Sequence, residues 1–444
     1  MPDAAVADRP VPAGLIDDRP DAGVFRVHRS IYLDPALFEA EMDRIFGTSW
    51  IYLCHASQVP AVGDYVSTRI GRHPVFAIRK PDGTVGCFLN ACAHRGALLT
   101  PRKTGNARTI TCRYHGWAYG CDGRCVKIRG EEGYEGTAVA RAAVSLTAVR
   151  VAEYKGFVFG CLDPHAEPLA DFLGDARAFI DLMAEQSDRG MEILRGESVY
   201  MMRANWKLQT ENSADGYHVA TVHRTFGTTL SFRDSLLGEG ADAMQKTEAA
   251  HILTLDKITS GGYDLGRGHM VSWSTRGMPE AVPLHEGRAA LEARLGPDMV
   301  RWMIDRGRTA TIFPNLLLND MASTCIRVWR PLAVDLTEIE TWCLAPVGES
   351  AAARRARIRK YEDFFFPASL AVPDDVAAME GAQDGTRAAD AGWNDLALGR
   401  ATMVAGADEA ARELGVAPLA SNPGRESETA FHGFYREWRR RMAG

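Results

Sequence analysis

The segment CAHRGALLTPRKTGNARTITCRYHGW, residues 92–117, contains two pairs of potential metal ligands. Cys92 and His94 form the first pair, and Cys112 and His115 form the second pair after an interval of seventeen residues. Short strands and turns surround the segment, so each pair is expected at the tip of a hairpin. Two thiolates and two imidazoles can bind one tetrahedral zinc ion, or an iron-sulfur cluster in which histidines ligate one iron.

The ligand spacing resembles that of Rieske proteins, which bind a 2Fe-2S cluster through two cysteines and two histidines. The resemblance favours such a cluster over zinc. Ala97 and Tyr114 occupy the positions where respiratory-chain Rieske proteins carry a disulfide, and Trp117 replaces their potential-raising serine. The sequence therefore resembles the lower-potential oxygenase and ferredoxin type, because hydrogen bonds to the cluster sulfurs help to set its potential.

A second metal motif lies in the segment ENSADGYHVATVH, residues 211–223. His218 and His223 are five residues apart, and on an irregular helical turn they can converge on one metal ion. A carboxylate from elsewhere in the chain would complete a two-histidine, one-carboxylate site with open positions, which is typical of non-haem Fe(II) oxygenases. A buried core histidine beside a solvated one is the alternative interpretation.

Nearly the whole chain resembles the large (α) subunits of Rieske non-haem iron aromatic ring-hydroxylating dioxygenases. It is most similar to the benzoate, toluate and anthranilate dioxygenases, also over residues 186–196, 359–365 and 393–395. The resemblance implies an α3β3 assembly with a separate β subunit, and addition of both atoms of O2 to adjacent ring carbons. NADH would supply electrons through a separate flavin and iron-sulfur reductase, since the chain lacks a Gly-x-Gly-x-x-Gly loop.

The same resemblance implies roles for two acidic positions. In the stretch around residue 375, Asp375 is expected to be the third iron ligand, with Asp374 as the alternative. An Asp-Asp pair is otherwise common at a helix N-cap, which Asp374 could provide at the same time. Asp215 is expected to bridge the iron-ligating His218 and the His115 of a neighbouring subunit, and to carry electrons between the centres.

A benzoate-like aromatic carboxylate is the substrate class that the resemblance implies. A carboxylate in a mostly apolar pocket needs a cation or several hydrogen-bond donors, and arginine can hold it through two hydrogen bonds. Arg224 follows ligand His223, and Arg327 lies on one face of a predicted strand. Both are candidates for binding the carboxylate, and both could instead form ordinary surface ion pairs.

The pattern of predicted elements divides the chain into three segments. Residues 1–45 form an N-terminal arm and helix that belong to the catalytic domain, and residues 46–165 form an all-β Rieske domain. Helices and strands alternate in residues 166–444, the catalytic domain with the mononuclear iron. The predicted fold class is therefore α+β, with the Rieske domain inserted into a catalytic domain whose central antiparallel sheet is flanked by helices.

Composition narrows the possible partners. The 444 residues include 46% apolar and 24% charged residues, an ordinary globular balance with room for two or three cores. The formal net charge is −6 and basic residues are dispersed, so we expect no nucleic-acid partner. No stretch approaches the roughly 18 apolar residues that span a bilayer, and the first residues resemble no export signal. We expect a cytoplasmic protein without a membrane contact.

The nine cysteines are expected to be metal ligands or buried thiols in a reducing compartment. Cys121 and Cys125 flank a predicted hairpin turn, where a disulfide or a further metal site is conceivable. Without additional ligands nearby, plain thiols are the favoured interpretation.

Two rival functions remain open at this point. A Rieske monooxygenase or demethylase of the same fold would use identical metal ligands, but the benzoate-like stretches favour a dioxygenase. A non-catalytic Rieske electron carrier would need no second centre, and the histidine pair with its distant aspartate argues against that class.

Overall fold

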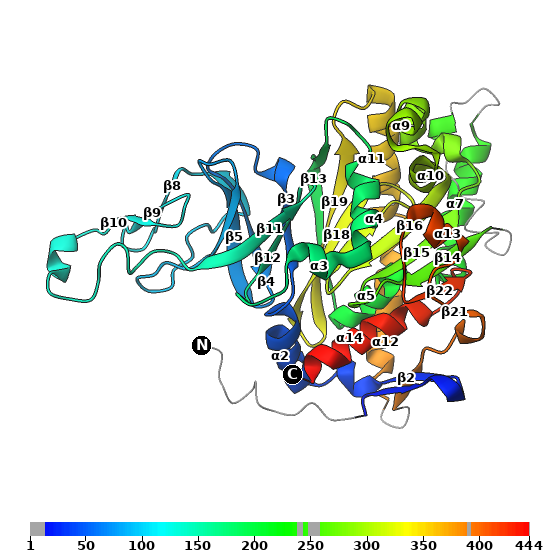
Figure 1. The fold of residues 1–444 in the computed structure, drawn as a ribbon, viewed down its shortest axis with the longest axis horizontal. Coiled ribbons are helices and arrows are strands. Elements are labelled where there is room, and N and C mark those ends of the chain that lie inside the picture. Colours follow the sequence, from blue (N-terminus) through cyan, green and yellow to red (C-terminus); the bar gives the residue numbers. More distant parts are fainter. Residues whose placement is uncertain (1–13, 238–242, 247–257, 389–391, 444) are drawn as a thin grey trace. The chain divides into compact units, whose positions relative to one another are not determined.

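The computed structural model describes residues 14–237, 243–246, 258–388 and 392–443. The chain forms two compact units, a smaller one of Phe46–Asp171 and a larger one that combines Met1–Ile45 with Phe172–Gly444. Strands dominate the smaller unit, whereas a nine-stranded sheet with helices forms the larger one (Figure 1). This insertion of an all-β unit into an α+β unit confirms the predicted fold class.

The smaller unit contains two antiparallel sheets, with the strand orders β3-β12-β11-β6-β5-β4-β7 and β10-β9-β8. β4 and β5 pair with each other in the larger of these sheets, and Phe76 and Ile78 of β5 are fully buried. Its strands are β3 (Ile51–His55), β4 (Asp64–Ile70), β5 (His73–Arg79), β6 (Val85–Leu89), β7 (Thr104–Asn106), β8 (Thr109–Thr111), β9 (Ala118–Gly120), β10 (Cys125–Lys127), β11 (Ala148–Tyr154) and β12 (Phe157–Cys161).

The larger unit is built on an antiparallel sheet with the strand order β13-β19-β18-β17-β16-β15-β14-β22-β21. A small separate sheet has the order β1-β2-β20. The strands are β1 (Ile16–Arg19), β2 (Val24–His28), β13 (Met191–Met202), β14 (Ser260–Asp264), β15 (Met270–Thr275), β16 (Arg306–Ile312), β17 (Leu316–Asn319), β18 (Cys325–Ala333), β19 (Leu336–Pro346), β20 (Trp393–Asp395), β21 (Val404–Ala405) and β22 (Ala420–Pro423).

Helices pack against this sheet: α5 on β16 and β18, α11 on β19, and α14 on β14 and β15. The helix predicted within residues 1–45 is α2, which begins after the Asp34 N-cap and continues into a π-helical turn over Met42–Phe46. The α-helices are α2 (Pro35–Glu41), α3 (Leu169–Leu173), α4 (Arg177–Ala184), α5 (Trp206–Ala214), α6 (Val219–Val222), α7 (Arg224–Ser235), α9 (Arg288–Leu295), α10 (Pro297–Val300), α11 (Ala351–Phe365), α12 (Val372–Gly385), α13 (Glu409–Leu414) and α14 (Thr429–Met442).

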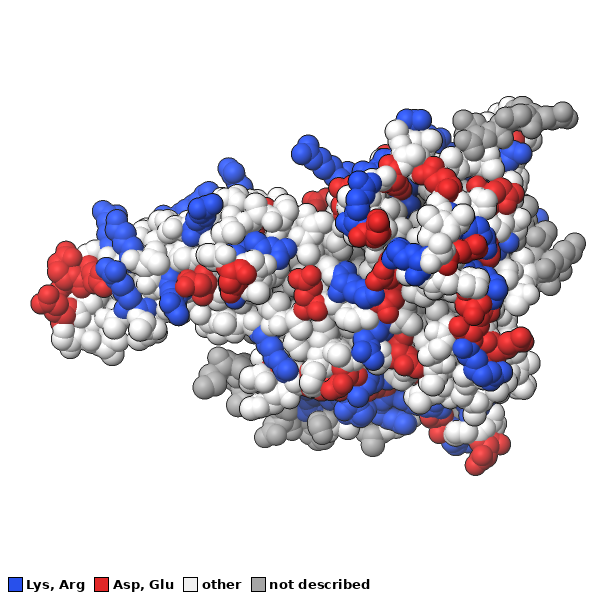
Figure 2. Space-filling model, turned by 45° about the horizontal axis from the view of Figure 1, so that its top comes forward, with Lys and Arg blue, Asp and Glu red and all other residues white. Residues whose placement is uncertain are grey.

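Charged side chains of both signs are interspersed on the face shown in Figure 2, in line with a chain of 51 basic and 57 acidic residues. Among the described helices, none combines the length and the apolar character that crossing a membrane requires.

A fully buried ion pair joins three helices of the larger unit. Lys207 of α5 donates to Glu41 of α2 over 2.6 Å, and neither side chain is exposed. The indole nitrogens of Trp206 and Trp438 also donate to Glu41, each over 2.7 Å. Burial lowers the pKa of Lys207, and the contact with Glu41 opposes that shift. The carboxylate therefore fixes α5 relative to α2 and α14.

We expect Glu41→Ala to lower the free energy of unfolding by about 3–5 kcal/mol, because the Lys207 ammonium would remain buried without a counter-ion. Chemical denaturation followed by circular dichroism measures this loss. Asp17→Ala breaks the surface pair with Arg19 and serves as the control, for which we expect little change. Similar small effects of both substitutions would contradict a structural role of the buried pair.

Candidate metal centres and cavity

Three side chains of the larger unit converge on one point. His218 immediately precedes α6, His223 lies between α6 and α7, and Asp375 lies in the first turn of α12. The His218 Nε2 and His223 Nε2 atoms are 3.2 Å apart, and Asp375 Oδ1 lies 3.4 Å and 3.2 Å from them. The predicted irregular helical turn thus brings both histidines to the carboxylate.

This triangle fits a metal ion. Its edges of 3.2–3.4 Å are those expected when three ligands bind one ion at about 2.1 Å. Two imidazoles and one carboxylate are the donor set of non-haem Fe(II) sites. The three residues form the one group of at least three such donors found together among the described residues.

Asp375, and not Asp374, points to the histidines. The carboxylate of Asp375 is almost completely buried, and the Asn212 side-chain amide donates to its Oδ1 atom over 3.3 Å. Asp374 lies within the first turn of α12, whose N-cap is Ala371. The expectation that Asp374 caps this helix is therefore wrong, because Pro373 also falls inside the first turn and the helix begins two residues earlier than Asp374.

The electrostatics of this triangle favour a bound cation. Burial raises the pKa of Asp375, but hydrogen bonds from both histidines outweigh it and hold the pKa below its usual range. Burial lowers the pKa of His218, whereas its contacts with Asp215 and Asp375 raise it to about 9. Two carboxylates thus attract a positive charge to His218, and a metal ion at Nε2 can supply it in place of a proton.

Asp215 lies behind His218, at the C-cap of α5. Its Oδ2 atom is 3.1 Å from His218 Nδ1, while its Oδ1 atom accepts from the Tyr217 backbone over 2.7 Å. The side chain is 23% exposed, so part of the carboxylate remains accessible. The next residue is Gly216, and a larger residue would not fit there, because its Cβ atom would lie 2.3 Å from the carbonyl oxygen of Arg425. The loop therefore orients His218 through Asp215 and leaves Asp215 partly open.

The second set of predicted ligands meets at two loops of the smaller unit. The Nδ1 atoms of His94 and His115 are 3.1 Å apart, and both cysteine side chains of the motif, Cys92 and Cys112, are buried. Gly96 and Gly116 close the two loops with φ angles of 69° and 76°, a left-handed conformation that favours glycine. Two imidazoles that face each other with two buried thiols fit a Rieske cluster.

Tyr119 of β9 is a residue near this cluster site that the sequence analysis missed. Its hydroxyl lies 3.2 Å from the Cys92 sulfur and accepts from the Ala93 backbone over 3.2 Å. If this hydroxyl donates to the Cys92 sulfur, it would raise the reduction potential of a bound cluster and would partly replace the serine that Trp117 displaces. In the sequence, the signal for this role is that Tyr119 comes two residues after Trp117. The Trp117 ring stacks on His94.

Cys121 and Cys125 are free thiols. The Cys121 sulfur donates to the Arg108 carbonyl over 3.2 Å, and the Cys125 sulfur donates to the Lys127 carbonyl over 3.7 Å. Backbone contacts therefore explain both side chains without a disulfide, in agreement with the favoured interpretation.

A cavity of about 170 Å³ opens next to the triangle of His218, His223 and Asp375. Phe364 lines it and packs against His223 with a ring-centroid distance of 5.2 Å. Phe226 and Leu230 of α7 and Phe365 of α11 add further apolar surface. Polar and charged residues such as Asn319, Asp320 and Arg425 also line the cavity. Aromatic surface together with polar groups beside a candidate metal site is the arrangement expected for an organic substrate.

The two predicted substrate arginines differ in position. Arg327 of β18 lines the cavity, is only 3% exposed and lies over the Phe365 ring at 5.5 Å. Its Nε and Nη2 atoms are buried without a hydrogen-bond partner among the described residues. Arg224 is exposed at the start of α7 and does not line the cavity. Arg224 is therefore rejected as a carboxylate ligand, because its side chain points to solvent from the first helical position.

Comparisons with known proteins identify the family. The Rieske 2Fe-2S domain matches residues 49–146, and the ring hydroxylating alpha subunit (catalytic domain) matches residues 191–444. Toluate 1,2-dioxygenase subunit alpha of Pseudomonas putida is 38% identical over 431 residues, 96% of this chain and 93% of the relative. The 2-halobenzoate 1,2-dioxygenase large subunit of Burkholderia cepacia is 38% identical over 440 residues, 98% of this chain and 93% of the relative.

A solved structure agrees with these matches. Naphthalene 1,2-dioxygenase with indole bound in the active site superimposes with a TM-score of 0.83 at 26% identity, covering 97% of this chain and 94% of that one. The match to a catalytic domain excludes a pure electron carrier. The predicted resemblance is thus confirmed: the chain belongs to the ring-hydroxylating dioxygenase alpha subunits, oxidoreductases that contain a Rieske 2Fe-2S cluster and a mononuclear iron.

Proposed function

We propose that this chain is the large subunit of a dioxygenase that converts a benzoate-like aromatic carboxylate to a cis-diol acid with O2 and electrons from NADH. A separate reductase would deliver the electrons. One observation supports a carboxylate as the substrate: Arg327 lines the cavity, and two nitrogens of its buried guanidinium have no hydrogen-bond partner among the described residues. The names of three relatives agree with it, since they act on toluate, 2-halobenzoate and anthranilate.

The two metal groups would use the ligand sets described above. Cys92, His94, Cys112 and His115 would hold the cluster, and a second set would hold the iron, namely His218, His223 and Asp375. When bound, the cluster supplies electrons and the mononuclear iron activates oxygen.

Arg327 would orient the substrate. Burying a guanidinium without a counter-ion costs several kcal/mol, so a carboxylate that enters the cavity is bound with part of that cost recovered. The planar fork of the guanidinium can hold both carboxylate oxygens and thereby fix which ring carbons face the metal triangle. Phe364 and Phe365 offer apolar contacts to the ring and keep water away from it.

Asp215 would connect the two kinds of centre. One of its oxygens lies 3.1 Å from His218 Nδ1, and its partly exposed side would be available to a second subunit. The neighbouring subunit's cluster ligand, equivalent to His115, is the partner that we propose for this side. The proposed α3β3 assembly would place the cluster of one chain beside the iron of the next.

We expect three irons per chain and a separation of the two sites by mutation. Cys92→Ser should remove the visible colour of the cluster, whereas His218→Ala should keep the colour and lose one iron. Metal analysis together with absorption spectra measures both effects. Loss of the colour in His218→Ala with an intact cluster signal in Cys92→Ser would show that the sites have been exchanged.

Asp215→Asn should leave both metal groups bound and slow electron transfer between them at least about tenfold, because the amide loses the charge and one acceptor. Rapid-mixing absorption measures reoxidation of the reduced cluster in the presence of substrate and O2. Reduction of the cluster by the reductase is the internal control and should keep its wild-type rate. Reoxidation at the wild-type rate would exclude Asp215 as the bridge.

Arg327→Met should lower kcat/KM for benzoate at least about thirtyfold, since truncation of one partner in a buried charge pair costs about 2–5 kcal/mol. Turnover of a benzoate and 2-aminobenzoate panel with a compatible reductase, with product identification, measures this. The matched control Arg224→Met changes an exposed arginine outside the cavity and should have little effect. Faster turnover of toluene or naphthalene than of benzoate by the wild-type enzyme would refute the carboxylate assignment.

A further inference from the structure

A second cavity adjoins the one beside the metal triangle. Gln186, Pro283, Leu284 and Arg357 line both cavities, so these four residues, here called the partition, lie between them. The cavity beside the metal triangle is called the inner cavity and the other one the outer cavity. The outer cavity continues along α9 and the turn before α11, where arginine side chains line it as well. A ligand that moves from the outer cavity to the inner one would have to pass these four residues.

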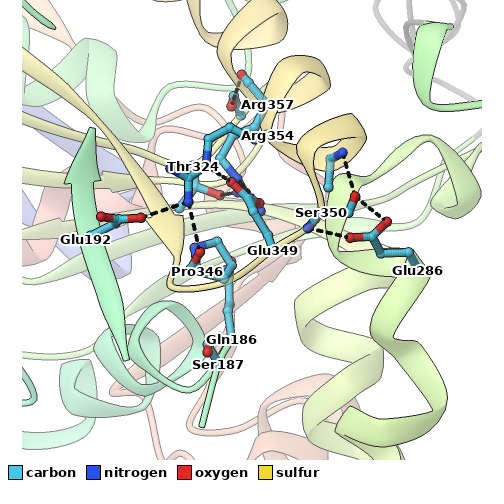
Figure 3. A network of polar contacts seen from close by, with 12 residues as sticks. Gln186, Ser187, Glu192, Glu286, Thr324, Pro346, Glu349, Ser350, Arg354 and Arg357 are labelled. Carbon is cyan, nitrogen blue, oxygen red and sulfur yellow. Dashed lines mark hydrogen bonds and ion pairs between the residues drawn. The ribbon is translucent and has the colours of Figure 1, made fainter. Parts of the chain in front are cut away.

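Ion pairs lead from the protein surface to this partition (Figure 3). Glu192, which is 40% exposed, accepts from Arg354 Nη2 over 2.8 Å, and Arg354 Nε donates to Glu349 over 2.7 Å. The other oxygen of Glu349 accepts from Arg357 Nε over 2.9 Å, and Glu349 and Arg357 are both almost completely buried. Charges of opposite sign thus alternate from solvent to the partition.

The inner side of Arg357 contacts the wall of the inner cavity. Its Nη1 atom donates to Thr324 Oγ1 over 2.5 Å, and Thr324 in turn donates to Asp320 over 3.2 Å. Arg308 balances the Asp320 carboxylate over 2.9 Å. The Nη2 atom of Arg357 makes no hydrogen bond to the described part of the chain, so two N–H donors remain for a ligand.

Arg357 and Arg327 both line the inner cavity, but they differ in how their charge is balanced. Glu349 already neutralises Arg357, whereas Arg327 has no carboxylate contact. A carboxylate should therefore be bound weakly at Arg357 and more tightly at Arg327. Movement from Arg357 to Arg327 would then be favourable, and a weak contact at Arg357 would not trap the ligand.

We propose that Arg357 is a transfer residue through which an aromatic carboxylate enters the inner cavity from the outer one. Its Nη2 donors hold the carboxylate while Gln186, Pro283 and Leu284 yield, and Glu349 keeps the guanidinium in place. This inference rests on the proposed function, because it requires a carboxylate as the ligand. Arg357 acts on the rate of entry and is not part of the final binding site.

Stopped-flow fluorescence of anaerobic holoenzyme mixed with 2-aminobenzoate tests this proposal. In Arg357→Gln, loss of the transient charge contact should slow association about tenfold and dissociation by the same factor, with Kd changed less than about twofold. Arg357→Lys should restore part of the rate. In Arg357→Gln, association of the uncharged 2-aminobenzamide should not be slowed. If the substitution instead collapsed the partition, association of both compounds would be slowed.

Arg354→Gln is the matched control, because Arg354 belongs to the same row of ion pairs but lines neither cavity. Its association rate should equal that of the wild type. Unchanged association in Arg357→Gln, or a Kd that weakens as much as association slows, would overturn the transfer role. If the wild-type protein does not bind 2-aminobenzoate, the proposed function fails and this inference fails with it.

Discussion

The architecture of the site depends on contacts that satisfy the buried charged side chains along α5. Lys207, Glu211 and Asp215 recur at every fourth residue, so they lie on one side of the helix and its C-cap. Lys207 contacts a buried glutamate, and two buried tyrosine hydroxyls donate to Glu211. Because these contacts fix the rotation of α5, Asp215 emerges beside His218 and not elsewhere. The stability of the core and the geometry of the candidate iron site therefore share one helix.

The candidate ligands were predictable to different degrees. Local spacing indicated the cysteine-histidine pairs and the pair His218 and His223, because each pair lies within one loop or turn. The choice of Asp375 came from resemblance, since no local pattern links residues more than 150 positions apart. In the structure, the first turn of α12 brings Asp375 to the histidines, whereas Asp374 is not part of the triangle.

Other features depended on tertiary contacts that no sequence pattern announces. Tyr119 of β9 lies beside the Cys92 sulfur, a contact between residues that are 27 positions apart in the sequence. The position of Arg224 next to His223 makes it a candidate in the sequence, yet its side chain is exposed to solvent at the start of α7. Strand alternation placed Arg327 on a face of β18, but only the fold shows that this face meets the cavity.

Other buried arginines of the same sheet form ion pairs with carboxylates, whereas Arg327 does not. Arg306 contacts Glu413 and Arg308 contacts Asp320, each over 2.9 Å. Arg327 is buried as deeply as Arg308, but no carboxylate of the described chain contacts it. A guanidinium stays charged at any ordinary pH, so it cannot avoid the cost of burial by losing a proton. Burial lowers the pKa of Arg327 and the charge of Asp375 raises it, but Asp375 makes no direct contact with the guanidinium. An aromatic carboxylate in the adjoining cavity would supply that contact, as proposed above.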